Sequence, residues 1–383
     1  MRIAIEAQRL FRTRKHGMDM VVLELIKNLQ KIDKENEYFI MVKPDVDKCI
    51  TETPNFRIIE VGGGPYPVWE QLRLPAAVRK LKCDLLHCTS NTAPEMPGLP
   101  LVLTLHDIIY MEGSWLSLLK GKGTSYQRFG NIYRRHNVPI AIKKSACVIT
   151  VSEFERERIA DFFRMSPQTL RAVYNGVGEH FKVISDPIEI DGYRKKFNLP
   201  EHYVFFLGNT VQKKNTPGTL KAFALFREKI GQDIPLVMLD FDRTDLLTIL
   251  EEIGEPGLID HIFLTGYVSN NELPGIYSLA DMFLYPSFRE SFGIPILEAQ
   301  KCGTPVITSN TSSMPEIAGD GALIIDPFKP EEICDAMLKI QSDPNLRQDL
   351  ITKGLVNSDK FSWRAMAESV LSIYKEVGKH YKY

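Results

Sequence analysis

Two glutamates, Glu290 and Glu298, stand eight residues apart in a segment whose residue types suit the binding of a ligand. The pattern predicts a strand ending at Pro286, a loop carrying Glu290, and a helix with Pro295 at its first position, where proline is favoured. Glu298 would lie one turn into that helix, and its carboxylate can accept two hydrogen bonds from a diol such as a ribose. The alternative is a surface helix with two solvent-exposed glutamates.

The residues between the two glutamates predict an anion-binding site. Phe292, Gly293 and Ile294 lie just before the expected helix, where backbone N–H groups bind anions with help from the helix dipole. Gly293 also lets the backbone approach a ligand closely. Gly303 suits the left-handed cap after the helix.

A second loop, residues 207–215, follows an expected strand and carries Lys213 and Lys214 just before a helix that begins at Thr216. Cations at a helix start oppose the helix dipole, and a phosphate ligand would explain their place. Solvent-exposed lysines are the alternative. The loop lacks the glycine and lysine spacing of an ordinary P-loop.

Short apolar runs alternate with amphipathic stretches along almost the whole chain, as expected of parallel strands covered by helices on both faces. Thirteen strands are too many for one open sheet, so the sequence predicts an α/β protein with two doubly wound, Rossmann-like domains. Ligands bind such sheets beyond the carboxyl ends of the strands. The expected strands are residues 2–6, 38–42, 56–61, 85–88, 100–105, 147–151, 171–174, 203–207, 235–239, 261–265, 282–285, 305–308 and 322–325.

The domain boundaries follow from a polar segment rich in turn residues. We expect a first domain over residues 1–184 and a second over residues 200–360, with a short basic helix between them. Residues 361–383 predict a final helix, which we expect to return to the first domain.

Composition excludes several classes of protein. The 383 residues include 47 Lys and Arg and 48 Asp and Glu, which argues against a nucleic-acid binder. The balance is uneven: residues 1–183 carry 27 basic and 20 acidic residues, and the rest carry 20 and 28. Six scattered cysteines without a Cys-x-x-Cys pair suit buried thiols in a reducing compartment. With neither a signal peptide nor an apolar run of about 18–20 residues, we expect a cytoplasmic protein.

Taken together, these motifs resemble the retaining glycosyltransferases of family 4, which have the GT-B fold of two Rossmann-like domains facing across a cleft. The resemblance covers nearly the whole chain in order. It rests on the Glu290-x7-Glu298 segment with Phe-Gly-Ile-Pro, the Lys213-Lys214-Asn215 loop, residues 303–307 (Gly-Thr-Pro-Val-Ile), 312–316 (Ser-Ser-Met-Pro-Glu), 1–7 and the Gly17 loop, 105–107 (Leu-His-Asp), 149–153 (Ile-Thr-Val-Ser-Glu) and 174–177 (Tyr-Asn-Gly-Val).

The resemblance implies a role for each matching residue. Glu290 would contact the sugar of a nucleotide-sugar donor, Glu298 would hold the ribose, and Lys214 with Lys213 would neutralise the diphosphate. His106 would reach the sugar from the first domain. The implied catalytic residues are His106, Glu290 and Lys214, and the implied donor-binding residues are Gly17, Gly208, Asn209, Lys213, Lys214, Phe292, Gly293, Ile294 and Glu298.

The chemistry implied by the family is transfer of a hexose, with mannose from GDP-mannose as the first candidate, to a hydroxyl group in polysaccharide biosynthesis. Retention is expected by front-face attack, in which the departing phosphate helps to deprotonate the acceptor. This route needs no carboxylate nucleophile, no metal ion and no cofactor. Cations and oriented amides at the leaving group suit it, since negative charge develops there.

Three positions depart from the family pattern. Many members have an arginine where Asn209 stands, so the charge must come from the two lysines. Many have glycine within residues 239–241, here Leu-Asp-Phe, which bears on recognition of the base. The Gly17 loop reads Gly-Met-Asp in place of Gly-x-Gly.

Residues 113–152 contain no acidic residue and predict a basic face. Its alternatives are a solvated surface and a site for an anionic acceptor, either a polyprenyl-diphosphate-linked glycan or the inner face of an anionic membrane. The face would include Lys120, Lys122, Arg128, Arg134, Arg135, Lys143 and Lys144 with Trp115, Tyr126, Phe129 and Tyr133, and a second cluster of Arg9, Arg12, Arg14, Lys15 and His16.

Two other functions fit the same fold. A sugar-nucleotide epimerase or hydrolase would release free sugar or an epimer without an acceptor. A non-catalytic binding module would bind the donor without turnover.

Overall fold

The computed structural model describes residues 1–383 except 14, 16, 113–124, 167–168 and 381–383, and only the backbone of residues 125–128. The chain divides into two compact units: residues 1–175 with 363–383, and residues 176–362. Each unit has its own sheet, and the pairs of strands in both sheets are parallel. The predicted α/β class with two doubly wound domains is confirmed.

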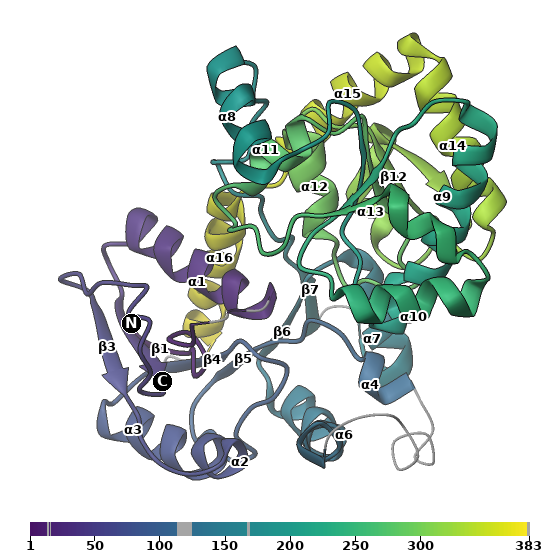
Figure 1. The fold of residues 1–383 in the computed structure, drawn as a ribbon. Coiled ribbons are helices and arrows are strands. Elements are labelled where there is room, and N and C mark those ends of the chain that lie inside the picture. Colours follow the sequence, from purple (N-terminus) through teal and green to yellow (C-terminus); the bar gives the residue numbers. More distant parts are fainter. Residues whose placement is uncertain (14, 16, 113–124, 167–168, 381–383) are drawn as a thin grey trace. The chain divides into compact units, whose positions relative to one another are not determined.

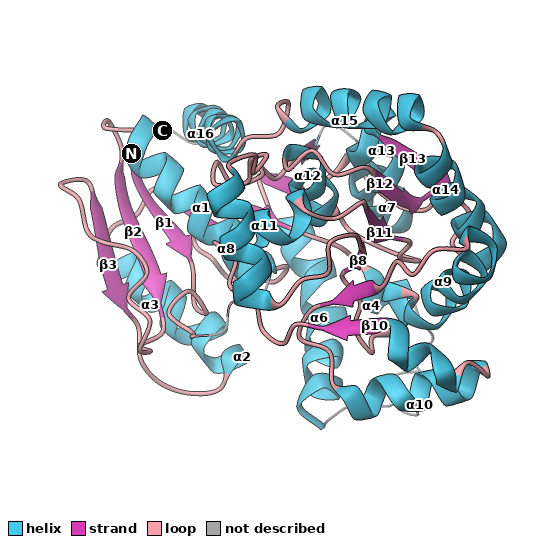
Figure 2. Cartoon of the chain, turned by 45° about the horizontal axis from the view of Figure 1, so that its top comes forward, coloured by secondary structure: helices cyan, strands magenta, loops and turns pink. Residues whose placement is uncertain are grey.

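The first unit contains a seven-stranded sheet of order β3-β2-β1-β4-β5-β6-β7, part of which faces the viewer in Figure 2. Its strands are β1 (Arg2–Glu6), β2 (Glu37–Val42), β3 (Phe56–Glu60), β4 (Leu85–Cys88), β5 (Leu101–Thr104), β6 (Cys147–Thr150) and β7 (Leu170–Ala172).

Helices pack on both faces of this sheet. Side chains of α3 and α6 share a core with Ala4, Phe39 and Leu86 on one face. On the other side α1 packs against α16, whose yellow ribbon lies beside the purple α1 in Figure 1 although the two are far apart in sequence. The helices are α1 (Gly17–Ile32), α2 (Tyr66–Val68), a π-helical turn (Trp69–Arg73), α3 (Leu74–Lys80), α4 (Ile109–Glu112), α6 (Ser125–Lys144), α7 (Glu153–Phe163) and α16 (Trp363–His380).

The second unit contains a six-stranded sheet of order β10-β9-β8-β11-β12-β13. Its strands are β8 (Val204–Phe206), β9 (Leu236–Met238), β10 (Ile262–Leu264), β11 (Met282–Tyr285), β12 (Val306–Ser309) and β13 (Ala322–Ile325). Its helices are α8 (Pro187–Phe197), α9 (Thr216–Ile230), α10 (Arg243–Ile253), α11 (Leu273–Ser278), α12 (Ile294–Lys301), α13 (Met314–Ala318), α14 (Pro330–Ser342) and α15 (Pro344–Ser358), with 3-10 turns at Gln212–Lys214, Pro256–His261 and Gly319–Gly321.

Each sheet has one point where the order of winding reverses. This point lies between β1 and β4 in the first sheet and between β8 and β11 in the second. In each sheet the second and third strands are added on one side of the first strand, and the following strands are added on its other side. We call these two places the switch points. Loops that leave neighbouring strands there diverge, and open α/β sheets bind their ligands in the space between them.

The boundary between the units lies at residue 175, earlier than the residue 184 expected from the sequence. The chain beyond it already packs on the second unit: Val177 bridges to Ser362, and the ring of Phe181 meets that of Tyr277. Residues 363–380 belong to the first unit. The helix expected to begin with Pro295 starts one residue earlier, at Ile294, so that proline takes the second position.

Candidate functional site

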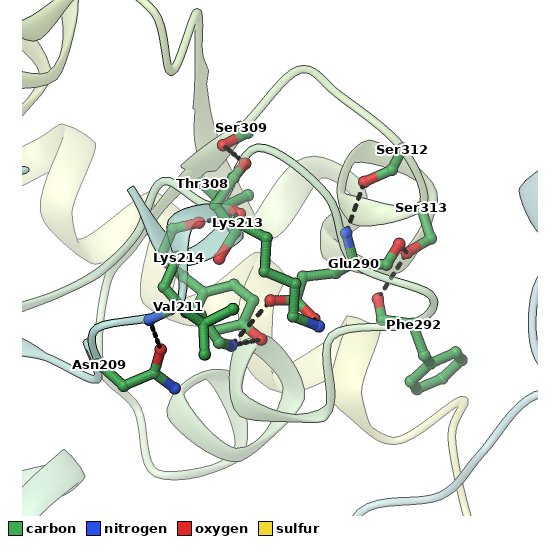
Figure 3. Close-up of polar contacts among 12 residues, drawn as sticks. Asn209, Val211, Lys213, Lys214, Glu290, Phe292, Thr308, Ser309, Ser312 and Ser313 are labelled. Atoms are coloured by element: carbon green, nitrogen blue, oxygen red, sulfur yellow. Dashed lines mark hydrogen bonds and ion pairs between the residues drawn. The ribbon is translucent and has the colours of Figure 1, made fainter. Parts of the chain in front are cut away.

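The second switch point brings Lys213, Lys214 and Glu290 into contact. The lysines lie in the 3-10 turn that follows β8, and Glu290 lies in the loop after β11. Because β8 pairs with β11, the two loops start side by side, and Phe288 N donates a hydrogen bond of 2.7 Å to Lys213 O between them. Figure 3 shows the three charged side chains pointing toward one another.

Glu290 is buried and forms ion pairs with both lysines. Its side chain is 10% exposed, with Oε1 2.7 Å from Lys214 Nζ and Oε2 3.3 Å from Lys213 Nζ. Burial opposes ionisation, but the charges of Lys214 and Lys213 outweigh it and lower the pKa of Glu290. Glu290 is therefore a carboxylate at neutral pH, held by two cations.

The two lysines differ in burial. The Lys214 side chain is 14% exposed and that of Lys213 is 39% exposed. Lys214 Nζ also donates to the hydroxyl of Tyr285 at 2.9 Å. Burial lowers the pKa of Lys214, although Glu290 partly offsets this effect. Lys214 is thus a desolvated cation, whose interaction with an anion is stronger than that of an exposed lysine.

The loop after β8 is fixed by its own polar groups. Asn209 accepts a hydrogen bond from Val211 N through its side chain and one of 2.6 Å from Thr216 Oγ1 through its carbonyl, so it shapes the loop and adds no charge. Gly208 leaves room for Phe206, whose ring would lie 2.3 Å from an added Cβ. Asn215 is buried at φ 55° and donates to the carbonyls of Pro286 and Pro327.

The helix that the sequence predicted after Gly293 is present as α12. Gly293 adopts φ 104°, a conformation that favours glycine, and precedes Ile294 at the helix start. The first amides of a helix have no partners within it, so the amide of Ile294 can bind an anion. Phe292 is buried, with its ring 6.0 Å from that of Phe361. Its side chain is therefore part of the packing and does not face a ligand.

Glu298 lies further along α12 and contacts a different partner. The hydroxyl of Tyr277 donates to Glu298 Oε2 at 2.9 Å. Burial raises the pKa of Glu298 to about 7, with the hydrogen bond from Tyr277 as a smaller opposing effect. This carboxyl group changes protonation near neutral pH, unlike Glu290.

Hydroxyl groups for which the sequence predicted no role support the Glu290 loop. Glu290 N donates to Ser312 Oγ at 3.0 Å, and Ser313 Oγ donates to the carbonyls of Glu290 and Phe292 at 3.0 and 2.9 Å (Figure 3). On its own, the serine segment indicated only a turn before a short helix. These contacts could not be predicted from local sequence, because the bonded residues lie 21 to 23 positions apart along the chain.

Two predicted site residues, His106 and Gly17, belong to the first unit. Gly17 begins α1, where Asp19 is buried and pairs with Arg9 at 2.9 Å. His106 follows β5 and is 5% exposed. Burial lowers the pKa of His106, while Asp107 and Asp19 oppose the shift and Arg9 adds to it.

The expected basic face is only partly a surface. Arg135 is buried and donates through Nε to Tyr110 O at 2.8 Å, and Tyr133 donates its hydroxyl to Glu70. These two residues are turned inward, contrary to expectation, because a buried carboxylate and a carbonyl need donors. Lys143 and Lys144 are exposed. Trp115, Lys120, Lys122, Arg14 and His16 lie outside the described residues, as do the side chains of Tyr126 and Arg128.

Neither a metal-binding cluster nor a membrane-spanning helix is present in the part of the chain that the structure describes. No group of three or more His, Cys, Asp or Glu side chains there is arranged to hold a metal ion. No described helix has the length and apolar character needed to span a membrane.

Two family models match the chain in succession. The model described as Glycosyltransferase Family 4 matches residues 16–180, and the model described as Glycosyl transferases group 1 matches residues 189–355. The second match contains both lysines and both glutamates of the site.

Curated relatives match over different lengths. The D-inositol 3-phosphate glycosyltransferase of Corynebacterium jeikeium is 41% identical over an alignment that covers 94% of this chain and 92% of that protein. O-antigen chain mannosyltransferase B of Escherichia coli is 30% identical over 247 residues, 63% of this chain and 64% of that protein. The serotype-specific mannosyltransferase WbdA of Escherichia coli is 26% identical, over 58% of this chain and 28% of that protein. The match thus spans less than two thirds of either mannosyltransferase.

Solved structures resemble the whole chain. A glycosyltransferase from Rickettsia africae ESF-5 gives a TM-score of 0.75 at 17% identity and covers 98% of both chains. Anabaena Alr3699/HepE, solved in complex with UDP and glucose, gives a TM-score of 0.72 at 16% identity and covers 97% of this chain and 99% of that one. At such low identity the likeness shows the fold, which is the predicted GT-B architecture.

Proposed function

This chain belongs to the family 4 glycosyltransferases, and we propose that it transfers a hexose from a nucleotide-diphosphate sugar to a hydroxyl group of a glycan or lipid-linked acceptor in polysaccharide biosynthesis. Mannose is the first candidate, because two of the relatives are named mannosyltransferases. The observation that carries the proposal is the contact of Lys213 and Lys214 with the buried Glu290 at a switch point.

This arrangement suits a donor with a diphosphate. The ion pairs hold both ammonium groups at the loop that leads into α12, and an anion can replace the carboxylate as their partner. The amide of Ile294 at the start of α12 can bind an anion as well. Glu290 then accepts hydrogen bonds from the sugar, and Glu298 accepts them from the ribose. The loop of Gly208 and Asn209 and the backbone of Phe292 and Gly293 line the same site.

The reaction needs charge stabilisation at the leaving group. When the bond between sugar and diphosphate breaks, negative charge grows on the nucleoside diphosphate, and positive charge spreads over the sugar ring. Lys213 and Lys214 stabilise the first, and the carboxylate of Glu290 stabilises the second. In the front-face route the departing phosphate takes the acceptor's proton, so configuration is retained without a protein nucleophile. These residues supply the charges that a metal ion would otherwise provide.

A thermal-shift screen of nucleotide sugars is the first experiment, since a ligand that binds only the native state raises the apparent stability. The ligand that binds is then tested for transfer to lipid-linked and soluble glycans with and without a chelator, and the anomeric configuration is read by NMR. We expect a shift with GDP-mannose, a retained linkage and activity with chelator. Absence of a shift with every nucleotide sugar would overturn the proposal. Free sugar released at the same rate without acceptor would indicate a hydrolase.

A further inference from the structure

The first switch point holds a buried polar network that surrounds His106. Glu6 ends β1, and the segment Thr89–Asn91 follows β4, the strand beside it. Both Glu6 and Asn91 are buried, at 1% and 4% exposed. Thr89 Oγ1 donates to Glu6 O at 2.7 Å, and Gln8 N donates to Glu6 Oε1 at 2.9 Å. The end of β1 therefore fixes the segment after β4.

That segment holds His106 at two atoms. The carbonyl of Thr89 lies 3.0 Å from His106 Nε2, and Asn91 Oδ1 accepts a hydrogen bond of 2.7 Å from His106 N. Asn91 N in turn donates to Thr104 O at 3.1 Å, in the strand that leads to His106. Asn91 thus joins the two strand ends through one side chain and one backbone group.

The contact with Thr89 decides which ring nitrogen carries the proton. Burial lowers the pKa of His106, so the imidazole is neutral at physiological pH and has a single N–H group. A carbonyl oxygen can only accept, so the proton lies on Nε2. Nδ1 is then an acceptor, suited to a hydroxyl group of a sugar.

The backbone of Asn91 indicates that its side chain is needed. Its φ is 72°, in the left-handed region where glycine is favoured and asparagine is tolerated. A glycine could adopt this conformation but would leave His106 N without its acceptor. We propose that Asn91 is a positioning residue for His106, which with the Thr89 carbonyl holds the imidazole as the Nε2–H tautomer and keeps Nδ1 as the acceptor. The use of that acceptor in catalysis rests on the proposed function.

The test compares two substitutions at Asn91 that separate the acceptor from the backbone, with one control and one assignment variant elsewhere in the chain. Asn91→Gly removes the acceptor and keeps the left-handed backbone, whereas Asn91→Asp keeps an acceptor oxygen. Asn198→Gly is the matched control, because Asn198 is also left-handed, at φ 51°, at the end of α8 in the second unit. His106→Gln assigns the His106 signals in the spectra.

The first readout is the ¹⁵N NMR spectrum of protein labelled at histidine. We expect a single Nε2–H tautomer for His106 in the wild type, in Asn91→Asp and in Asn198→Gly, and a mixture in Asn91→Gly. The second readout is kinetic: kcat of Asn91→Gly falls about tenfold, the equivalent of one well-placed hydrogen bond, and KM for the donor stays near the wild-type value. Asn91→Asp restores kcat.

The two readouts test the role of Asn91 and the role of His106 separately. A wild-type tautomer and wild-type kcat in Asn91→Gly, with only lower stability, would overturn the inference and leave Asn91 a structural residue. Full activity in His106→Gln would overturn the proposed role of His106, and the spectra would still decide whether Asn91 positions the ring.

Discussion

The two sheets place polar groups at the same topological position but use different chemistry. At the first switch point, Glu6 is held by hydroxyl and amide groups, and the neutral His106 is fixed by one carbonyl and one asparagine. At the second, Glu290 is held by two lysines. The first network is a set of directed hydrogen bonds, whereas the second is a set of ion pairs.

The difference indicates what each site can do when a ligand arrives. A lysine that leaves one carboxylate for a phosphate keeps an anionic partner, so the second site can rearrange at little cost. A buried hydrogen bond that breaks leaves an unsatisfied group, which costs about 1–3 kcal/mol. We therefore expect the second site to exchange partners on binding and the first to stay fixed.

The largest expected effect tests the exchange of partners. Glu290→Gln keeps the shape of the side chain but removes the charge that both lysines balance. We expect kcat to fall about 100-fold or more, since the carboxylate stabilises the transition state. Affinity for a nucleoside diphosphate should stay equal or rise, because the lysines no longer have a competing anion. Parallel kinetics and calorimetry measure the two effects, and an equal loss in both would show that Glu290 only supports the fold of the site.

A smaller effect ranks the two lysines by burial. Lys214→Met should weaken nucleoside diphosphate binding about 30-fold, the equivalent of about 2 kcal/mol for a desolvated charge pair. Lys213→Met should weaken it only about threefold, as expected of an exposed pair. Calorimetry at two salt concentrations measures both, with a weaker salt dependence in each variant. The reverse ranking would contradict the assignment of Lys214 as the main diphosphate ligand.

The third effect concerns Glu298, the titrating member of the second site. With its pKa raised to about 7, Glu298 is protonated as pH falls from 8 to 6 and loses acceptor capacity for the ribose. Affinity for a nucleotide sugar should fall by up to about tenfold per pH unit below 7. A nucleotide sugar is the right probe because its diphosphate, esterified at both ends, does not titrate in this range.

Glu298→Gln is the control for that titration. Because glutamine does not titrate, the affinity of this variant for the nucleotide sugar should lose the pH dependence that Glu298 causes. Its stability should also differ in a defined direction: the folded pKa of Glu298 exceeds the unfolded one, so the wild type loses stability as pH rises from about 4.5 to 7, and the variant does not. Thermal melts should therefore show the variant gaining on the wild type toward pH 8. If the stability of the variant and of the wild type changed in parallel with pH, the pKa of Glu298 would not be raised in the folded protein.

Much of the fold could be predicted, because strands and helices follow from local periodicity. All thirteen expected strands are present within a few residues of their expected bounds. The boundary at 175 was missed because no composition change marks it; it depends on Phe181 and Val177 packing on the second unit. The inward turn of Arg135 was missed because its partner, the carbonyl of Tyr110, is 25 residues away.

The candidate site could be predicted in part. The residue types of the two loops indicated an anion site, and their place at strand ends indicated a shared edge. The serines that support Glu290 and the hydroxyl of Tyr285 on Lys214 could not be predicted, since a hydroxyl group is compatible with many environments until its neighbours are known.

The sequence by itself determined the elements, their parallel arrangement and the residue types at the strand ends, since these depend on neighbours along the chain. The strand order that sets β8 beside β11 and β1 beside β4 came only from the tertiary structure. The tertiary structure pairs Glu290 with two lysines, buries Glu298 so that its pKa is raised to about 7, and sets His106 against the carbonyl of Thr89. Charge and protonation depend on distance in space and on exclusion of water, and neither is encoded in the spacing of residues along the chain.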